Sequence, residues 1–255
     1  MEQKKWNGWR PLVVLLLLLL TWEVIVKINS VPDWLLPAPS QIVLEGINEW
    51  PSYYTHILST IKLSLLGFFI GSSIGLLTAA FLHLIPFIRE AFYPLLILSQ
   101  NVPVIVLAPL LIIWFGFGLL PKIIVITLVC FFPITVAALD GFRLTAPELK
   151  HYMTMAGAGK WQLFWKLELP YALPSLFSGL KISATYSVMG AVISEWLGAK
   201  SGLGVYMTFA SSSFRTDRVF IAIFWVMLLS YLFFSAIKLL ERYLVRWKYK
   251  GENPK

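Results

Sequence analysis

The chain has 255 residues, of which 58% are apolar and only 13% are charged. A soluble globular domain carries roughly twice that share of charge, so the composition excludes this class and predicts an all-α polytopic membrane protein. The net charge of +8 does not indicate a nucleic-acid partner, because so few charges are better explained by Lys and Arg in cytoplasmic loops.

The first predicted span covers residues 11–28, an apolar run just long enough to cross a hydrocarbon core of about 30 Å. Lys4, Lys5 and Arg10 precede it. A cleaved signal peptide is the alternative, because it also has a charged start followed by a leucine run. No small-x-small cleavage site follows directly, and Trp22 is typical of an interfacial anchor, so we favour the span.

Residues 29–56 form a mixed segment with four prolines and no Lys or Arg. A loop without basic residues belongs on the outer side of the membrane. Within it, residues 40–50 place apolar side chains at helical spacing, which predicts a short helix on the membrane surface.

The second predicted span, residues 57–84, carries a doubled G-x-x-x-G pattern at Gly67, Gly71 and Gly75. Glycine lets a neighbouring helix approach closely, and in lipid such packing drives much of helix association. We therefore expect a helix-packing face here, the alternative being glycines that the helix merely tolerates.

The third predicted span, residues 92–115, contains Gln100, Asn101, Pro103 and Pro109, so we expect an irregular backbone at depth. Irregular backbone is tolerated in a bilayer only where protein buries it or water lines it. The span is expected either to border a translocation path or to form a kink packed inside the bundle.

Three further spans are predicted at residues 122–139, broken at Pro133, and at 173–197 and 219–240. With the N-terminus inside, six spans form a single domain over residues 1–255 and place both termini and residues 145–170 in the cytoplasm. Fourteen of the 21 basic residues then lie inside, as the positive-inside rule requires. These are Lys4, Lys5, Arg10, Arg89, Arg143, Lys150, Lys160, Lys166, Lys238, Arg242, Arg246, Lys248, Lys250 and Lys255.

Residues 145–170, here called the coupling segment, are the main polar interruption of the chain. Thr145 stands three residues before Glu148, the spacing of a capping box, and Pro147 suits a first helical turn. A helix is therefore expected to start here. Its apolar face consists of Leu149, Tyr152, Met153 and Ala156.

Gly157 is expected to end this helix in a left-handed turn, and a second short helix should run from Lys160 until Pro170 interrupts it. A compact loop with an apolar face can lie against its own membrane or insert into a groove of a partner protein. The residues alone leave both uses open.

The coupling segment resembles the signature loop of permease subunits of ATP-binding-cassette (ABC) importers, whose pattern is E-A-A, three residues, G, nine residues, I-x-L-P. Gly157 matches the signature glycine, and Leu169 and Pro170 match the closing L-P. The opening E-A-A falls on His151, Tyr152 and Met153, which is a departure; Glu148 is the nearest substitute for the missing glutamate.

The resemblance extends over roughly residues 30–245 and is to the alkanesulfonate, taurine and nitrate branch, with its relatives that carry thiamine pyrimidine precursors. Its motifs include L-L-P-x-P-S-Q at 35–41, A-P-L-L-I-I-W-F-G at 108–116 and S-E-W-L-G-A-K-S-G-L-G at 194–204. The resemblance implies a permease of the bacterial inner membrane whose coupling helix rests in a cleft of cytoplasmic ATPase subunits.

It also implies three further partners: a second permease copy forming a homodimer, an external or periplasmic substrate-binding protein, and membrane lipid. ATP and Mg would be used by the ATPase partner, with no cofactor bound by this chain. The expected ATPase-coupling residues are Glu148, Leu149, Tyr152, Met153, Ala156, Gly157 and Pro170. A membrane anchor that recruits a cytoplasmic protein without moving a solute is the alternative of another class.

The chain itself is not expected to be an enzyme. The nearest phosphate-loop candidate, at Gly159 and Lys160, has Thr154 and Trp161 where the motif needs Gly and Ser or Thr. The three histidines fall on separate segments, and the single cysteine, Cys130, excludes an intramolecular disulfide and a cysteine-based zinc site.

Residues expected along a translocation path are polar side chains within predicted spans: Gln100, Asn101, Ser183, Ser187 and Glu195. A carboxylate near the end of an apolar span is costly and usually faces a cavity or a partner. With Glu195 and aromatic residues but no evident buried Arg, the path favours a neutral or cationic heteroaromatic solute, such as a thiamine pyrimidine precursor. The alternative is an alkanesulfonate, taurine or nitrate.

Overall fold

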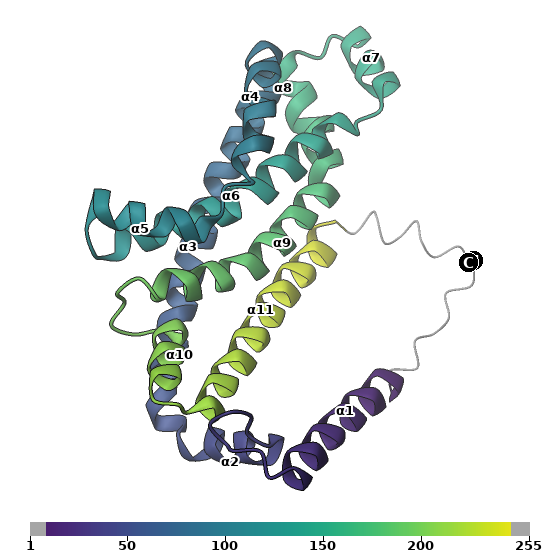
Figure 1. Ribbon diagram of the computed structural model, residues 1–255. Coiled ribbons are helices and arrows are strands. Elements are labelled where there is room, and N and C mark those ends of the chain that lie inside the picture. The colour runs from purple at the N-terminus through teal and green to yellow at the C-terminus, as the bar shows by residue number, and fades with distance from the viewer. Residues whose placement is uncertain (1–8, 246–255) are drawn as a thin grey trace.

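The computed structural model describes residues 9–245, and every regular element in that part of the chain is a helix (Figure 1). This follows from the apolar sequence, because in lipid the backbone N–H and C=O groups must be satisfied within the segment that carries them. The basic residues expected inside at Lys4, Lys5, Arg246, Lys248, Lys250 and Lys255 lie outside the described residues.

The helices follow one another with short connections. They are α1 (Trp9–Ile28), α2 (Pro39–Asn48), α3 (Trp50–Leu84), α4 (Pro86–Ser99), α5 (Val104–Phe115), α6 (Leu119–Arg143), α7 (Pro147–Met155), α8 (Lys160–Leu163), the π-helical turn η1 (Phe164–Glu168), α9 (Leu169–Glu195), α10 (Leu203–Ser212) and α11 (Thr216–Leu244).

Five helical segments are long and apolar enough to cross a membrane: α1, α3, α6, α11, and the continuous helix formed by α8, η1 and α9. A sixth span exists if α4 and α5 together count as one. The chain is therefore an all-α polytopic membrane protein, and the short helix expected at residues 40–50 is present as α2.

The third predicted span is not one helix. The chain breaks after Ser99, and α4 and α5 meet at an angle of 99°. The irregular backbone predicted within residues 92–115 is therefore present, as a sharp break between two helices. Pro103 is the N-cap of α5 and cannot continue the helix that precedes it, which fixes the position of the break.

Two predictions based on proline were wrong. Helix α6 runs through Pro133 without a break. The helix that contains the fifth predicted span begins at Lys160, because the chain stays helical through Pro170. At about 1.5 Å per residue this helix is about 54 Å long, well beyond a hydrocarbon core of about 30 Å, so part of it projects from the membrane.

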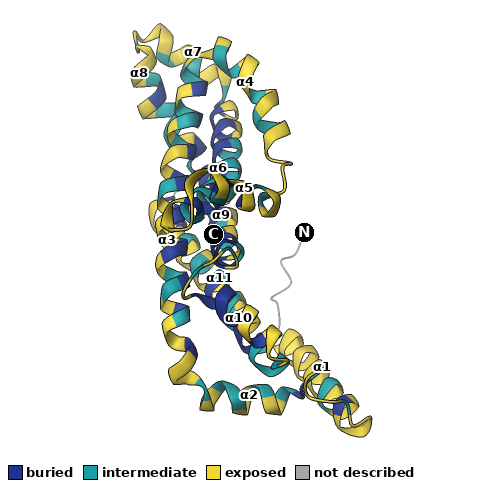
Figure 2. Cartoon of the chain, turned by 60° about the vertical axis from the view of Figure 1, so that its left-hand side comes forward, coloured by how far each residue is buried: buried dark blue, intermediate teal, exposed yellow. Residues whose placement is uncertain are grey.

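Helices α3, α6 and α9 pack together as the centre of the molecule, and their facing sides are buried (Figure 2). The glycine face of α3 lies against α6. A Cβ atom added at Gly71 would lie 2.8 Å from Cys130 Cβ and 2.9 Å from the carbonyl oxygen of Thr127, so only glycine allows this approach. Gly67 faces Ile126, and the carbonyl of Gly75 accepts a 3.2 Å hydrogen bond from the Thr135 hydroxyl.

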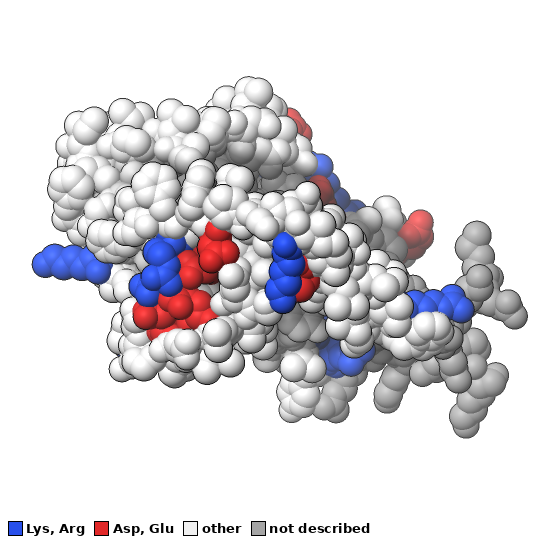
Figure 3. Space-filling model, turned by 60° about the horizontal axis from the view of Figure 1, so that its bottom comes forward, with Lys and Arg blue, Asp and Glu red and all other residues white. Residues whose placement is uncertain are grey.

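Helix α11 packs along α9, where Lys181 forms a 2.8 Å ion pair with Glu241. At the end of the molecule where α2 lies, a cluster of acidic and basic side chains stands on a mostly uncharged surface, with other charged side chains apart from it (Figure 3). Glu45 of α2 pairs there with Arg215 and Arg218, and Glu49 pairs with Arg218. These pairs fasten α2 to the start of α11.

Helix α1 lies apart from the core, with only Val26 buried.

The glycine contact yields a direct test. We expect Gly71→Ala to destabilise the permease by about 1–3 kcal/mol, because the added methyl group forces α3 away from the backbone of α6. The measurement is thermal unfolding of the detergent-solubilised protein. Ser73→Ala on the exposed side of α3 is the matched control and should leave the unfolding temperature unchanged. Equal unfolding temperatures for the two variants would show that the close approach is not needed.

Candidate functional site

The coupling segment starts as a helix at Pro147, as expected, but not by the expected cap. Ala146 is the N-cap residue of α7 and no side chain caps the helix. The Thr145 hydroxyl is buried without a hydrogen-bond partner, so the predicted capping box between Thr145 and Glu148 is wrong. Pro147 supplies the helical start instead, since its fixed φ suits the first turn and its missing N–H needs no partner there.

Helix α7 presents large apolar side chains to the outside of the chain. Tyr152 is 74% exposed and Met155 is 78% exposed, with Leu149 at 45%. Met153 is partly buried and Ala156 is exposed. Met155 lies outside the periodicity that selected the other residues, so sequence reasoning missed it. The exposed face continues beyond α7 in Trp161 and Trp165.

The turn after α7 is built on Gly157, whose φ is +83°. No other atom lies within 4 Å of a Cβ added at this position, so it is backbone conformation rather than crowding that favours glycine. The chain then re-enters helix at Lys160 and does not stop before Pro170, contrary to expectation. The π turn η1 explains this: the Leu169 N–H donates to the carbonyl of Phe164, and the widened turn leads into a proline that has no N–H.

Glu195 is 1% exposed, and its carboxylate is fully engaged. One oxygen accepts a 2.8 Å hydrogen bond from the Thr60 hydroxyl, and the other accepts a 2.8 Å bond from the backbone N–H of Gly204. The Thr60 oxygen in turn accepts the N–H of Leu203. Glu195 therefore links α3 to the start of α10, which offsets the cost of burying a carboxylate.

The other residues expected on a path do not lie together. Ser183 and Ser187 are completely buried; the Ser183 hydroxyl donates to the carbonyl of Cys130, and that of Ser187 donates to Ala184 in its own helix. Gln100 and Asn101 are exposed at the break between α4 and α5. The structure thus separates these residues into a buried group on α9 and an exposed pair beside the break.

A cavity of about 570 Å³ opens between α3, the start of α6 and the loop after α9. We call it the lysine cavity, because three of its lining residues are lysines and none is acidic. It is lined by Ser59, Lys62, Leu63, Leu66, Phe117, Gly118, Leu119, Lys122, Gly198, Lys200 and Ser201.

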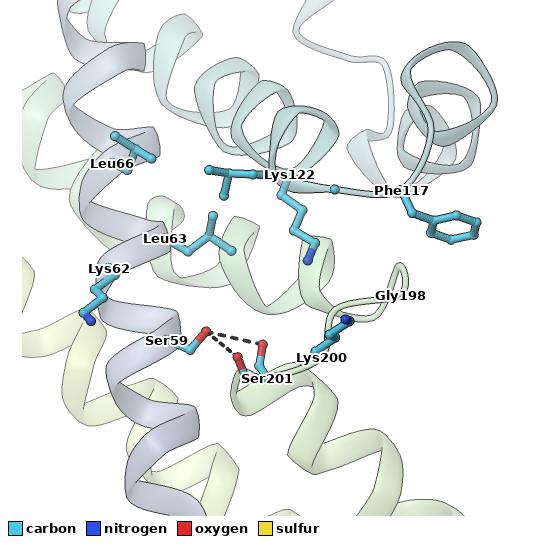
Figure 4. A pocket seen from close by; sticks show the side chains of 11 residues that line it. Ser59, Lys62, Leu63, Leu66, Phe117, Lys122, Gly198, Lys200 and Ser201 are labelled. Atoms are coloured by element: carbon cyan, nitrogen blue, oxygen red, sulfur yellow. Dashed lines mark hydrogen bonds between the residues drawn. The ribbon is translucent and has the colours of Figure 1, made fainter.

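Figure 4 shows the Lys122 side chain directed toward the loop that carries Gly198 and Lys200, whereas Lys62 points away from it. The hydroxyls of Ser59 and Ser201 lie 3.0 Å apart and join α3 to this loop. That these three lysines line one cavity could not be found from sequence spacing, since three separate segments contribute them.

Within residues 9–245, no group of three or more His, Cys, Asp or Glu residues is placed to hold a metal ion.

Residues 67–246 match a protein-family model described as "Binding-protein-dependent transport system inner membrane component".

The chain is 36% identical to the formylaminopyrimidine transport permease protein ThiX of Halalkalibacterium halodurans, over 97% of this chain and 99% of that protein. It is 33% identical to the riboflavin transport system permease protein RibX of Chloroflexus aurantiacus, over 97% of this chain and 93% of that protein. It is 29% identical to the putative aliphatic sulfonates transport permease protein SsuC of Bacillus subtilis, over 98% of this chain and 92% of that protein.

The role of the Glu195 cluster can be tested through its threonine. We expect Thr60→Val to destabilise the permease by about 1–3 kcal/mol, because one oxygen of Glu195 and the N–H of Leu203 both lose a buried partner. Ser64→Ala is the matched control: Ser64 lies one turn along α3, is equally buried, and its hydroxyl has no hydrogen-bond partner. Thermal unfolding should separate the two variants, and equal losses would contradict the assigned role of Thr60.

Proposed function

The chain belongs to the family of binding-protein-dependent transport system inner membrane components, the permeases of ABC importers, and we propose that it moves a small organic nutrient delivered by an external binding protein. Permease subunits of this family are not enzymes, and ATP hydrolysis resides in their partner subunits. The family implies both an ATPase and a substrate-binding protein as partners.

The observation that carries the proposal is the exposed apolar face of α7. Tyr152 and Met155 are each about three-quarters exposed on a helix that projects from the bundle (Figure 1). An apolar helix face of this kind fits a groove on a partner. The proposed occupant is the cytoplasmic ATPase, with Glu148, Leu149, Met153 and Ala156 completing the contact. Gly157 sets the turn, and Pro170 lies in the helix that continues into the membrane.

This assignment orients the protein. With α7 in the cytoplasm, α2 and its charged pairs face outward, toward the binding protein. Both termini are then cytoplasmic, as the basic residues of the chain favour. A second copy of the permease is proposed to complete the path, with lipid around the remaining apolar surface of this bacterial inner-membrane protein.

The translocation path is proposed to pass the lysine cavity and the break between α4 and α5, where Gln100 and Asn101 are exposed. Glu195 and Ser183 serve behind this surface by holding α3, α6, α9 and α10 in place, whereas Ser187 is buried and bonds only within α9. Buried polar side chains that hydrogen-bond between helices are a common way to fix helix positions in membranes.

The proposed solute is a neutral heteroaromatic compound of the thiamine pyrimidine precursor type. The support is the similarity to the formylaminopyrimidine permease, whose whole length the chain matches. The lysine cavity disfavours the cationic solute that the sequence left open, because the lining of the cavity is positively charged. An anionic solute such as a sulfonate remains the alternative, and it has the support of the sulfonate permease.

The test is uptake into proteoliposomes that contain the permease with its ATPase subunits, with the binding protein outside and ATP inside. Labelled formylaminopyrimidine should accumulate only when all components and ATP are present. Accumulation of labelled taurine instead would overturn the proposed solute but not the transport function. If neither compound enters while the ATPase still binds α7, the chain acts as an anchor and the proposed function is wrong.

The same assay tests the turn at Gly157. We expect Gly157→Val to lower uptake by about 5- to 30-fold, because a side chain in the left-handed region costs about 1–2 kcal/mol and displaces the docking helix. Gly159→Val is the matched control: both positions have open space around them, but only Gly157 has a positive φ. Unchanged uptake with Gly157→Val, or an equal loss with Gly159→Val, would refute the role of the turn.

A further inference from the structure

Two parts of the coupling segment meet the end of α3 at the carboxylate of Glu168. The Lys150 ammonium of α7 lies 2.6 Å from one oxygen. The Nε2–H of His83, near the end of α3, donates to the other oxygen over 2.8 Å. Glu168 ends the π turn η1, so one carboxylate joins α7, α3 and the helix that continues as α9.

The residues around the Glu168 carboxylate are buried and closely packed. The side chain of Glu168 is 7% exposed and that of His83 is 10% exposed. The imidazole of His83 is packed against two aromatic rings, with centroid distances of 4.6 Å to Phe142 and 6.2 Å to Phe164. A carboxylate that is this well buried, and that is held by an ammonium group and by an imidazole, has the geometry in which removing one partner is most damaging.

Helix α7 has few other attachments. Among the described helices it packs to a significant extent only against the adjacent α8, and the turn at Gly157 has open space around it. Lys150, 30% exposed, provides the polar contact from α7 to the helices that cross the membrane. Without that contact, a force on α7 could be absorbed by rotation at the glycine turn.

Glu168 faces inward at the end of the π turn η1. Phe164 and Glu168, at the two ends of η1, are buried, while Trp165 and Lys166 between them are exposed. Single π turns occur frequently at functional sites in helices, where they redirect a side chain. Here the turn ends on a carboxylate that contacts His83 of α3.

We propose that Glu168 is a positioning residue that holds α7 against α3 through Lys150 and His83, and so transmits displacement of α7 to the membrane-spanning helices. The transmission rests on the proposed function, in which an ATPase moves α7. The attachment of α7 does not, because it is a property of the permease alone.

The attachment is tested by pulsed electron paramagnetic resonance on the permease in lipid nanodiscs. Spin labels are placed at Met155→Cys on α7 and Leu77→Cys on α3, both exposed, in a Cys130→Ala background. Glu168→Leu should raise the population with a displaced α7 by about tenfold or more, because Lys150 loses its partner. Lys150→Met is a milder variant at a more accessible position and should give the same displacement.

Two comparisons make the result specific. Lys166→Met removes a charge from the same turn, where the side chain is exposed, and should leave the distance distribution unchanged. The double variant Lys150→Glu/Glu168→Lys reverses the pair and should restore the original distribution, since neutral His83 can accept a hydrogen bond as well as donate one. An unchanged distribution in Glu168→Leu, or no recovery in the double variant, would overturn the proposal.

Transmission is tested in the complex with the ATPase subunits, using labels at Lys62→Cys and Lys200→Cys beside the lysine cavity. ATP with vanadate should change their distance in the parent, and Glu168→Leu should lose this change while ATP hydrolysis continues. Loss of hydrolysis together with the distance change would indicate a merely structural role. If the parent shows no nucleotide response, the proposed function fails, and the nanodisc measurement still decides the attachment of α7.

Discussion

The close approach of α3 to α6 determines the geometry of the rest of the molecule. Gly71 brings the two backbones together where any side chain would collide with Cys130 and Thr127, and the Thr135 hydroxyl bonds to the α3 backbone one turn along. Helix α9 joins the same unit through paired contacts between Ser183 and Cys130. Because packing rather than hydrophobic burial holds helices together in lipid, this unit is the rigid body on which the coupling segment and the lysine cavity are mounted.

Buried carboxylates then fasten the less tightly packed parts to this unit. Glu195 holds the start of α10 against α3, Glu168 holds α7, and Glu241 pairs with Lys181 between α11 and α9. Each carboxylate has partners from another segment, which is the condition under which charge is tolerated away from water. Attachment by a polar contact suits α7 in particular, which must keep a defined position while packing against few other helices.

Composition and hydrophobic periodicity predicted the fold class, the five long apolar helices and the exposed helix of the coupling segment, since these depend on local sequence. The errors arose where contacts with a neighbouring segment, rather than the local sequence, decide whether a helix continues through a proline. Pro133 and Pro170 lie within continuous helices, while Pro103 stands at a real break, and the local pattern does not distinguish these cases. Glu195 was recognised as unusual from sequence, but its partners Thr60 and Gly204 come from the tertiary structure.

The most direct measurement of the central claim is photo-crosslinking in the complete complex. A benzophenone amino acid is placed at Tyr152 or Met155 of α7, and at Leu77 of α3 as a control exposed to the same extent. Docking of the ATPase on α7 predicts covalent adducts with the ATPase subunit from the first two positions and none from Leu77. An absence of ATPase adducts from α7, or equal yields from Leu77, would contradict the assignment of α7 as the contact that links ATP hydrolysis to the membrane helices.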